Sequence, residues 1–310
     1  MQIKPSKAGC QPVRYLWRSS DEVINMDVST SPSVPHVEYF PPPRVPRGPI
    51  RWLGWITDDR RQLARFWPVV QNMVVQELRV RYQRSVVGFF WTLLHPILMM
   101  ATLTIVFSQL FGTTTEHYAI LLFSGMVPWT FMSGTINDSA FSIISNEQLI
   151  RKIFLPKIVF PLTRLLINLT TFVLSLVSLF ILMKPLGVQL TPQLILLPVA
   201  IFLLTVFTFG LGLLIATTNT FFRDCGHLVS VFLQAWYFAT PIIYPETDVP
   251  AWRLWSNPAY PFIKLFQVIV SEGKWPDLKL FLVAAGIATV SLGIGYVAFK
   301  CHEDKFVFRL

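Results

Sequence analysis

Long apolar stretches, separated by short charged segments, follow one another from residue 87 to near the C-terminus. Between Arg84 and Glu116 there is no Asp, Glu, Lys or Arg, a gap of 31 positions, and gaps of 21 and 38 such positions follow after Glu116 and Lys184. About 20 consecutive apolar residues cross the roughly 30 Å of bilayer hydrocarbon as a helix. The pattern therefore predicts six membrane-spanning helices, at about 87–111, 118–136, 160–183, 193–217, 227–244 and 280–299.

A different helical periodicity precedes the first stretch. Thr57-Asp58-Asp59 resembles a helix start, and Pro68 suits the first turn of a second helix over about 68–84. One side of this second helix is apolar, with Phe66, Val70, Met73, Val74 and Leu78 at three- and four-residue spacing. The opposite side is polar and basic, with Gln71, Asn72, Gln76, Arg79 and Gln83. Direct fusion to a membrane span favours amphipathic helices in the membrane interface over 51–85, rather than ordinary surface helices.

The first 50 residues lack both patterns. They hold nine of the 23 prolines, including the run PPPRVPRGP at 41–49. Such a segment buries too little apolar surface to fold, so we expect a disordered or polyproline-type arm, either a solvated tail or a docking segment. The N-terminus also lacks the apolar core of a signal peptide, so we expect no cleavage.

Composition agrees with a membrane protein. Hydrophobic residues make up 53% of the chain and charged residues only 14%, whereas about a quarter of a soluble domain is charged. The net charge of +9 does not indicate a nucleic-acid partner, because the basic residues flank the apolar stretches. Cys10, Cys225 and Cys301 are widely spaced, so we expect free thiols and no metal site.

The distribution of Lys and Arg predicts the orientation. The segments that would share one side of the membrane carry 21 of these residues and the opposite segments carry five. By the positive-inside rule both termini are cytoplasmic, in a multi-pass protein of the inner (cytoplasmic) membrane. An even number of spans agrees with this placement.

Two loops carry structure of their own. SNEQLIRKIFLP (145–156), on the cytoplasmic side, can form a short helix with Leu149, Ile150, Ile153 and Phe154 on an apolar side. On the outer side, 257–273 is mostly apolar but too short to cross and is interrupted by prolines, so we expect a re-entrant or interfacial segment between the fifth and sixth spans.

Motifs for catalysis or nucleotide binding are absent from the sequence. There is no GxxxxGK[ST] phosphate loop, no GxSxG elbow and no HExxH helix. His95 in the first stretch is either a proton carrier or a neutral packed histidine. We favour the packed histidine, because no carboxylate lies within the predicted spans, and the same absence argues against an ion-coupled transporter.

Three segments together resemble a known family. Arg81, Tyr82, Ser85, Gly88 and Trp91 match the Arg-Tyr-x-x-Ser-x-x-Gly-x-x-Trp run that joins an interfacial helix to the first span in the membrane subunits of type-2 ABC exporters for polysaccharides. Pro96 also matches, whereas Val87 stands where Leu is usual. Segments 146–162 and 221–245 are similar to those that enter the third and fifth spans of that family. The first 50 residues lie outside the resemblance.

The resemblance implies an all-α membrane protein, not an enzyme, that works as a homodimer with a separate cytoplasmic P-loop ATPase dimer. ATP and Mg would bind that partner, leaving no cofactor on this chain. The substrate implied is a lipid-linked polysaccharide, such as O-antigen, capsule or teichoic acid, moved through a channel between the subunits. Residues 146–155 would then be the helix that couples to the ATPase, rather than a loop helix lying on the membrane; its candidates are Asn146, Glu147, Leu149, Ile150, Arg151, Lys152 and Phe154.

Candidate substrate contacts follow from side-chain chemistry. Sugar C–H faces stack on aromatic rings, although aromatic belts at the membrane interfaces are an alternative. The channel-lining candidates are Phe89, Phe90, Trp91, Trp129, Phe131, Trp236, Tyr237 and Tyr244. Arginine suits phosphate, although the same arginines satisfy the positive-inside rule alone. The candidates for the lipid headgroup are Arg79, Arg81, Tyr82 and Arg84.

Two other functions fit parts of the sequence. One is a drug or lipid exporter of the same architecture, which the short loops and the aromatic content disfavour. The other is a membrane-embedded glycosyltransferase. Charged residues are available for it in 245–279, without recognisable pairing: Glu246, Asp248, Arg253, Lys264, Glu272 and Lys274.

Overall fold

The computed structural model describes residues 51–83, 94, 97–99, 101–106, 115–183, 191–244, 246 and 249–309. These residues belong to one compact unit, Pro46–Leu310, and their regular secondary structure is entirely helical. The proline-rich arm predicted over 1–50 and most of the first predicted span, including His95, lie outside the described residues.

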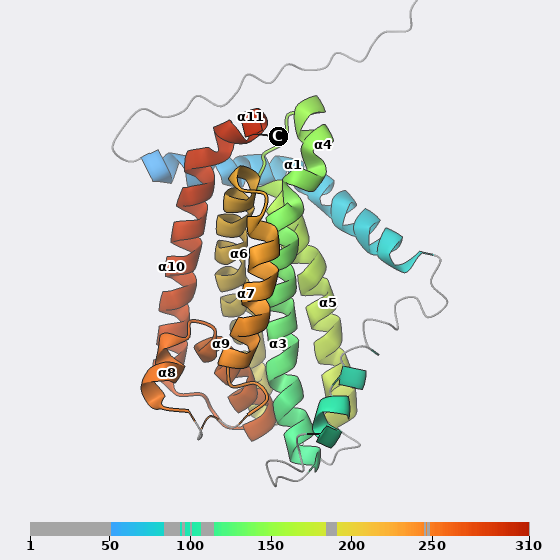
Figure 1. The fold of residues 1–310 in the computed structure, drawn as a ribbon, viewed down its shortest axis with the longest axis vertical. Helices are drawn as coiled ribbons and strands as arrows, with labels where there is room; N and C mark the ends of the chain where they lie inside the picture. The colour runs from blue at the N-terminus through green and yellow to red at the C-terminus, as the bar shows by residue number, and fades with distance from the viewer. Residues whose placement is uncertain are drawn as a thin grey trace, which may run out of the picture. The chain divides into compact units, whose positions relative to one another are not determined.

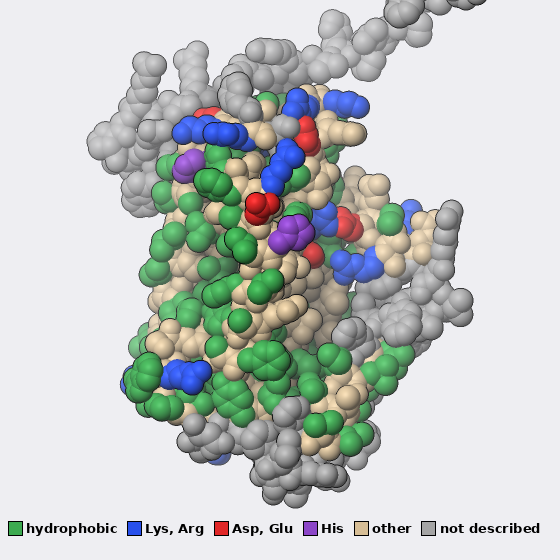
Figure 2. Space-filling model, viewed as in Figure 1, with side chains coloured by type: hydrophobic (Ala, Val, Ile, Leu, Met, Phe, Trp, Pro, Cys, Tyr) green, Lys and Arg blue, Asp and Glu red, His purple; other side chains and the backbone are tan. Residues whose placement is uncertain are grey.

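Four long helices form the bundle (Figure 1). They are α3 (Thr115–Ser142), α5 (Val159–Met183), α6 (Leu197–Phe221) and α10 (Leu278–His302). Each is long and apolar enough to cross a membrane. These helices correspond to the second, third, fourth and sixth predicted spans. Figure 2 shows charged side chains gathered near one end of the visible face and sparse along its middle.

The fifth predicted span, 227–244, forms a shorter helix than expected, α7 (Cys225–Ala239). Thr240 is extended, and Pro241 follows it. Proline disfavours the helical conformation of the preceding residue, so the helix ends although the apolar sequence continues. At 1.5 Å per residue, 15 residues cover about 22 Å, which is short of a full crossing.

The segment 51–85 forms one helix, α1 (Arg51–Tyr82), rather than the two that we predicted. It begins before Thr57 and has Pro68 inside. The predicted faces are correct: Val70 is fully buried, whereas Gln71 and Gln76 are exposed. α1 packs against α5, and Figure 1 shows it crossing one end of the bundle.

Helix α3 lies at the centre of the core. It packs against α5, α6, α7, α9 and η5. In its most apolar stretch 78% is buried inside the protein, against 22% in the corresponding stretch of α10. The helix also extends six residues past its predicted end at 136, so Asp138 lies inside a helix of the bundle. Asp138 accepts a hydrogen bond from Asn168 Nδ2 of α5 at 2.8 Å. Our expectation that no carboxylate lies within the spans is therefore wrong at this position.

The two ends of the bundle differ. At one end, the α4 end, lie α4 (Glu147–Lys152), α11 (Phe306–Arg309) and the C-terminus (Figure 1). At the other, the α9 end, lie α8 (Ala251–Ser256) and α9 (Tyr260–Phe266), which continues as a π-helical turn, η5 (Gln267–Glu272). Gly273 closes η5 with φ 59°, a left-handed conformation that favours glycine. Phe262, Phe266 and Ile269 fill the core at this end.

Helices α6 and α10 touch through their backbones. A Cβ atom added to Gly295 would lie 2.0 Å from the carbonyl oxygen of Gly210, and one added to Gly210 would lie 2.4 Å from the carbonyl carbon of Ser291. Ser291 Oγ also donates a hydrogen bond across the pair to the carbonyl oxygen of Phe207 at 3.0 Å. Small residues allow such close packing of helices in a membrane, where burial of apolar side chains alone provides little attraction.

Candidate functional site

The segment between α3 and α5 forms a short exposed helix. A 3₁₀ turn, η2 (Ile144–Asn146), follows α3, and Asn146 Nδ2 donates to the carbonyl oxygen of Ser142 at 2.7 Å. Within α4, Glu147 and Arg151 form an ion pair at 2.9 Å, one helical turn apart. Ile153 is extended, so the helix is shorter than the predicted 146–155 and Phe154 lies beyond it. Pro156 prevents this helix from continuing into α5, because a proline cannot donate to a carbonyl one turn earlier.

The apolar side predicted for this helix is divided in the structure. Leu149 and Ile150 are half-buried on α4, whereas Ile153 and Phe154 are 53% and 58% exposed in the extended segment after it. Arg151 and Lys152 are also exposed. The α4 region therefore presents two cations beside two large apolar side chains. Apolar side chains with neighbouring charges are typical of a surface that binds another protein.

Beneath α4 lies a second hydrophobic cluster, separate from the main core. Its buried members come from the ends of α3, α5, α6, α10 and α11: Ile143, Ile158, Leu213, Ala216, Phe299 and Phe306. Ile150 of α4 and Leu63 of α1 pack against it. Ile150 therefore connects α4, through a close-packed cluster, to residues at or near the ends of several long helices.

A polar network holds the same region together. Lys157 Nζ, after α4, donates to the carbonyl oxygen of Glu303 at 2.6 Å. Lys300 of α10 pairs with the Glu303 carboxylate and, at 2.7 Å, with Asp59 of α1. Tyr296 donates to the other oxygen of Asp59 at 2.8 Å. The network therefore joins α1, the end of α10 and the segment that leads from α4 into α5.

Burial changes the pKa of Lys157, a cation of this network that lies outside the membrane-spanning helices. Desolvation lowers the pKa of the Lys157 ammonium group, and the nearby carboxylates of Glu303 and Asp304 only partly offset this effect. A buried charge is stable only when it is paired and hydrogen-bonded. Glu303 is therefore the residue on which the placement of Lys157 depends.

A buried amide joins three helices near the α4 end. Asn219 of α6 is fully buried; its Nδ2 donates to the carbonyl oxygen of Ala140 on α3 at 2.8 Å, and its Oδ1 accepts from Gly226 N of α7 at 2.7 Å. Ser230 of α7 donates to Asn137 of α3 at 2.7 Å. These residues were not predicted from the sequence. A polar amide near the end of an apolar stretch could have indicated them, because such groups commonly form hydrogen bonds between helices.

The predicted headgroup candidates lie at the C-terminal end of α1. Arg79 and Arg81 are exposed there, and among the described residues neither forms an ion pair. Glu77, on the same helix, pairs with Arg164. Arg164 lies near the start of α5 and of the third predicted span. The Tyr82 side chain and Arg84 lie outside the described residues.

The aromatic candidates separate into two groups. Trp129 of α3 contacts the rings of Trp236 and Tyr237 of α7, each with centroids 5.7 Å apart, and Trp236 Nε1 donates to Asn257 at 2.8 Å. Trp236, Tyr237 and Tyr244 are half-buried, whereas Trp129 is buried. Phe131 is 3% exposed and stacks on a phenylalanine of α5 inside the core. Phe89, Phe90 and Trp91 lie outside the described residues.

A charge cluster lies at the α9 end. Lys264 of α9 pairs with Glu246 at 2.8 Å and with Glu272 at 2.7 Å, Tyr260 donates to Glu246 at 3.0 Å, and Lys274 pairs with Glu272 at 3.2 Å. These pairs were not recognisable in the sequence, because the partners are up to 18 residues apart. Each carboxylate is already held by a cation, so the cluster stabilises the fold at this end.

The pKa shifts agree with that structural role. Burial alone would lower the pKa of Lys264, but hydrogen bonds and charges from Glu246 and Glu272 outweigh it, and the pKa is raised. Burial alone would raise the pKa of Glu272, but Lys264 and Lys274 outweigh it, and the pKa is lowered. Within the described ranges, no three His, Cys, Asp or Glu side chains come together as a metal site requires.

Comparison with known proteins places this arrangement. A family model described as "ABC-2 type transporter" matches residues 68–270. The chain is 30% identical over 251 residues to the O-antigen export system permease protein RfbA of Myxococcus xanthus, covering 79% of this chain and 96% of that protein. It is 28% identical to the protein of that name from Klebsiella pneumoniae, over 74% of this chain and 90% of that protein. The polysialic acid transport protein KpsM of Escherichia coli is 22% identical, over 77% and 95%.

Proposed function

Because the chain belongs to the ABC-2 type transporter family, we propose that it is the membrane subunit of an ATP-driven exporter that moves a lipid-linked, O-antigen-like polysaccharide out of the cytoplasm. The observation that carries the proposal is similarity over at least 90% of the length of two relatives named for O-antigen export. The sequence contains no phosphate loop, so ATP and Mg would bind a separate P-loop ATPase subunit.

The α4 end faces the cytoplasm in this proposal, because most Lys and Arg residues belong to segments on that side. In this orientation α4 is the docking element for the ATPase. Four exposed side chains support this assignment: Arg151, Lys152, Ile153 and Phe154. They lie above the buried cluster to which five helices, or the turns next to them, contribute.

Coupling follows from this packing. When the ATPase subunits close on ATP, they displace the α4 region, and Ile150 transfers that movement to the cluster beneath. The network of Lys157, Glu303, Lys300 and Asp59 keeps α1 and α10 in register with the displaced segment. The ends of the spans then move together instead of being pushed apart.

A homodimer with a channel between its subunits completes the proposal. An exposed apolar stripe along α7 is available to a second copy or to lipid; it consists of Leu228, Val231, Phe232 and Phe238.

Substrate contacts are proposed on the same helix and on α1. Trp236, Tyr237 and Tyr244 are half-buried on or just after α7 and are the aromatic candidates with accessible surface for sugar rings. Arg79 and Arg81 would hold the phosphate of the lipid carrier. The stretch 87–111 and the segment 227–244, of which α7 is the helical part, supply the remaining two spans, and α9 with η5 forms the re-entrant segment.

Deletion of the gene, followed by glycan analysis of the cell and its surface, tests the proposal. We expect lipid-linked glycan to accumulate inside the cell and to disappear from the surface, with recovery when the intact chain is restored. Affinity purification of the tagged chain should also recover a P-loop ATPase. Normal surface glycan together with new drug sensitivity would contradict the polysaccharide substrate, and transport by the chain alone would contradict the ATPase partner.

A further inference from the structure

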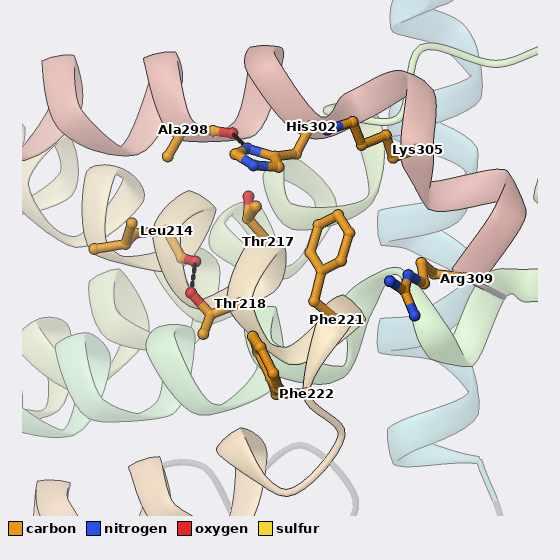
Figure 3. Close-up of a pocket in the computed structure, with 9 residues that line it drawn as sticks. All are labelled: Leu214, Thr217, Thr218, Phe221, Phe222, Ala298, His302, Lys305 and Arg309. Carbon is orange, nitrogen blue, oxygen red and sulfur yellow. Dashed lines mark hydrogen bonds between the residues drawn. The ribbon is translucent and has the colours of Figure 1, made fainter.

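A hollow opens between α6 and the α10–α11 corner at the α4 end (Figure 3). Its volume is about 640 Å³. One wall is apolar and includes Leu214 of α6 and Ala298 of α10, with the exposed ring of Phe222 at its edge. The other side carries Lys305 and Arg309. The hollow therefore combines an apolar wall with two cations.

Lys305 and Arg309 differ from two other basic residues of the same region. Lys157 and Lys300 are held by Glu303 or Asp59. Lys305 and Arg309 are exposed, and within the part of the chain that the structure describes neither forms an ion pair. Arg309 instead lies over the ring of Phe221, 5.8 Å from its centroid. Figure 3 shows its guanidinium group beside that ring. The positive charge at the hollow is thus open to an anion.

The position of the hollow indicates what kind of anion it meets. The candidate spans that contain α6 and α10 end at Phe221 and Lys305, and both of these residues line the hollow. Leu214 and Ala298 lie about two turns earlier in these spans, towards the middle of the bundle. The cations are therefore at the level of lipid headgroups, and the apolar wall is at the level where acyl chains begin.

Polar groups that would select a sugar are scarce in the hollow. The hydroxyls of Thr217 and Thr218 donate to carbonyl oxygens of their own helix, at 2.8 and 2.9 Å. Nδ1 of His302 lies 2.8 Å from the carbonyl oxygen of Ala298, which only accepts hydrogen bonds. The remaining chemistry is positive charge next to apolar surface.

We infer that this hollow binds an anionic phospholipid of the surrounding bilayer, with its headgroup phosphate on Lys305 and Arg309 and the start of an acyl chain on Leu214 and Ala298. Occupancy holds the α10–α11 corner, where Phe306 packs into the cluster beneath α4. The bound lipid thereby stabilises the base on which α4 rests. This inference depends on α6 and α10 being in a membrane and not on the identity of the transported substrate.

Binding to the full-length protein in detergent, measured by native mass spectrometry, tests the inference. The probes are phosphatidylglycerol and phosphatidylcholine with identical acyl chains. Because a basic residue near an anionic surface contributes about 1 kcal/mol, the double substitution Lys305→Gln/Arg309→Gln should weaken phosphatidylglycerol binding by roughly tenfold or more. The matched control Arg60→Gln/Arg61→Gln removes two exposed arginines of α1 that do not line the hollow, and should leave binding nearly unchanged.

A steric variant distinguishes lipid binding in the hollow from attraction of the lipid to positive charge in general. Ala298→Leu fills the apolar wall with both cations intact and should also weaken phosphatidylglycerol binding. Its control is Gly286→Leu, in a purely apolar hollow elsewhere between α6 and α10, where a Cβ would meet no atom within 4 Å. All six substituted residues are at least partly accessible. Gly286 and Ala298 lie within α10, so monodisperse elution of each variant is checked first.

Four outcomes would overturn the inference. They are equal binding of the two lipids by the unaltered protein, an equal loss in the Arg60→Gln/Arg61→Gln control, full displacement of the lipid by inorganic phosphate alone, and tighter binding of a polyprenyl phosphate than of phosphatidylglycerol. The third outcome would indicate a site for free phosphate, and the fourth a site for the transported lipid.

Discussion

At the scale of single residues, Gly210 of α6 and Gly295 of α10 bring the backbones of two long helices into direct contact. Alanine at Gly295 would place a methyl group 2.0 Å from the carbonyl oxygen of Gly210, which is too close for any carbon atom. The backbone of α6 would have to move, because no side chain at that point can rotate away. Such overpacking destabilises a protein by about 1–3 kcal/mol, and more where backbone must shift.

We therefore expect Gly295→Ala to lower the thermal unfolding temperature of the purified protein by several degrees or to prevent its accumulation. Gly293→Ala is the matched control, because it lies on the same helix with no atom within 4 Å of a new Cβ. Alanine also favours helix over glycine by about 1 kcal/mol, so the control should keep or slightly raise stability. Equal loss in both variants would contradict the close contact.

The charge cluster at the α9 end gives a second residue-scale prediction, on pH. The lowered pKa of Glu272 means that its contribution to stability is complete above the ordinary glutamate value and is lost as pH falls through the lowered value. The raised pKa of Lys264 means that its contribution is complete below the ordinary lysine value and is lost as pH rises through the raised value. Stability from this cluster should therefore be constant at neutral pH and decrease in strong acid and strong base.

Comparison of Lys264→Met with the unaltered protein measures this contribution. At neutral pH we expect the variant to be less stable by about 2 kcal/mol, since Glu246 and Glu272 lose their shared charged donor. The difference between the two proteins should shrink as pH falls through the lowered pKa of Glu272, because the carboxylate then becomes protonated in the unaltered protein as well. A difference that stays constant from neutral pH into strong acid would show that the ion pairs are not its source.

At the scale of elements, α4 has an exposed surface that contacts among the described residues leave largely free. Arg151 and Lys152 are exposed, and the only ion pair of Arg151 among the described residues is with Glu147 on the same helix. An exposed pair of this kind contributes at most about 0.5 kcal/mol, so its loss leaves the fold intact. Substitutions here consequently report on a partner and not on stability.

We expect Arg151→Glu/Lys152→Glu to reduce the amount of ATPase recovered with the tagged protein by severalfold, and to reduce surface glycan, at an unchanged unfolding temperature. Arg60→Glu/Arg61→Glu makes the same change of charge on α1 and should leave ATPase recovery close to normal. Unchanged assembly and transport in the α4 variant would contradict its assignment as the docking element.

The same scale shows which elements the sequence predicts well and why others differ. Charge gaps predict α3, α5, α6 and α10 because long apolar runs have few alternatives in water or lipid. The early end of α7 depends on Pro241, inside a run that stays apolar. The start of α1 was misplaced for another reason. Asp59 resembles a helix start, yet it is buried and paired with Lys300, a partner 241 residues away that no local pattern contains.

At the scale of the whole molecule, the exposed stripe on α7 concerns the assembly of two chains. Exposed apolar side chains also occur on α10, at Val290 and Ile294, so exposure alone does not distinguish an interface from a lipid-facing side. The homodimer proposal does distinguish them, because it places α7 and not α10 between the subunits.

Disulfide cross-linking of single cysteines in membranes tests that difference, after Cys10, Cys225 and Cys301 are replaced by serine. We expect Val231→Cys or Phe238→Cys on α7 to form covalent dimers on mild oxidation, and Val290→Cys on α10 to remain monomeric. Dimers from α10 and none from α7 would contradict the proposed interface.

Long-range polar contacts are what the sequence could not supply about the molecule as a whole. The all-helical architecture, the membrane spans and the family all follow from patterns within about 30 residues. The network of Asp59, Lys300, Glu303 and Lys157 and the amide of Asn219 join segments up to 244 residues apart. Their members look like ordinary charged or polar residues until the fold brings them together. The coupling residues were predicted by resemblance, whereas the base on which they rest emerged only from the fold.

The backbone contact between α6 and α10 has a consequence for how such a transporter can change shape. The backbones touch directly at Gly210 and Gly295, and Ser291 donates a hydrogen bond to Phe207 across the same contact. We therefore expect the two helices to move together. We expect an opening pathway to be produced by displacement of α5, α7 and α1 around this stationary pair, which then serves as the frame of the transport cycle.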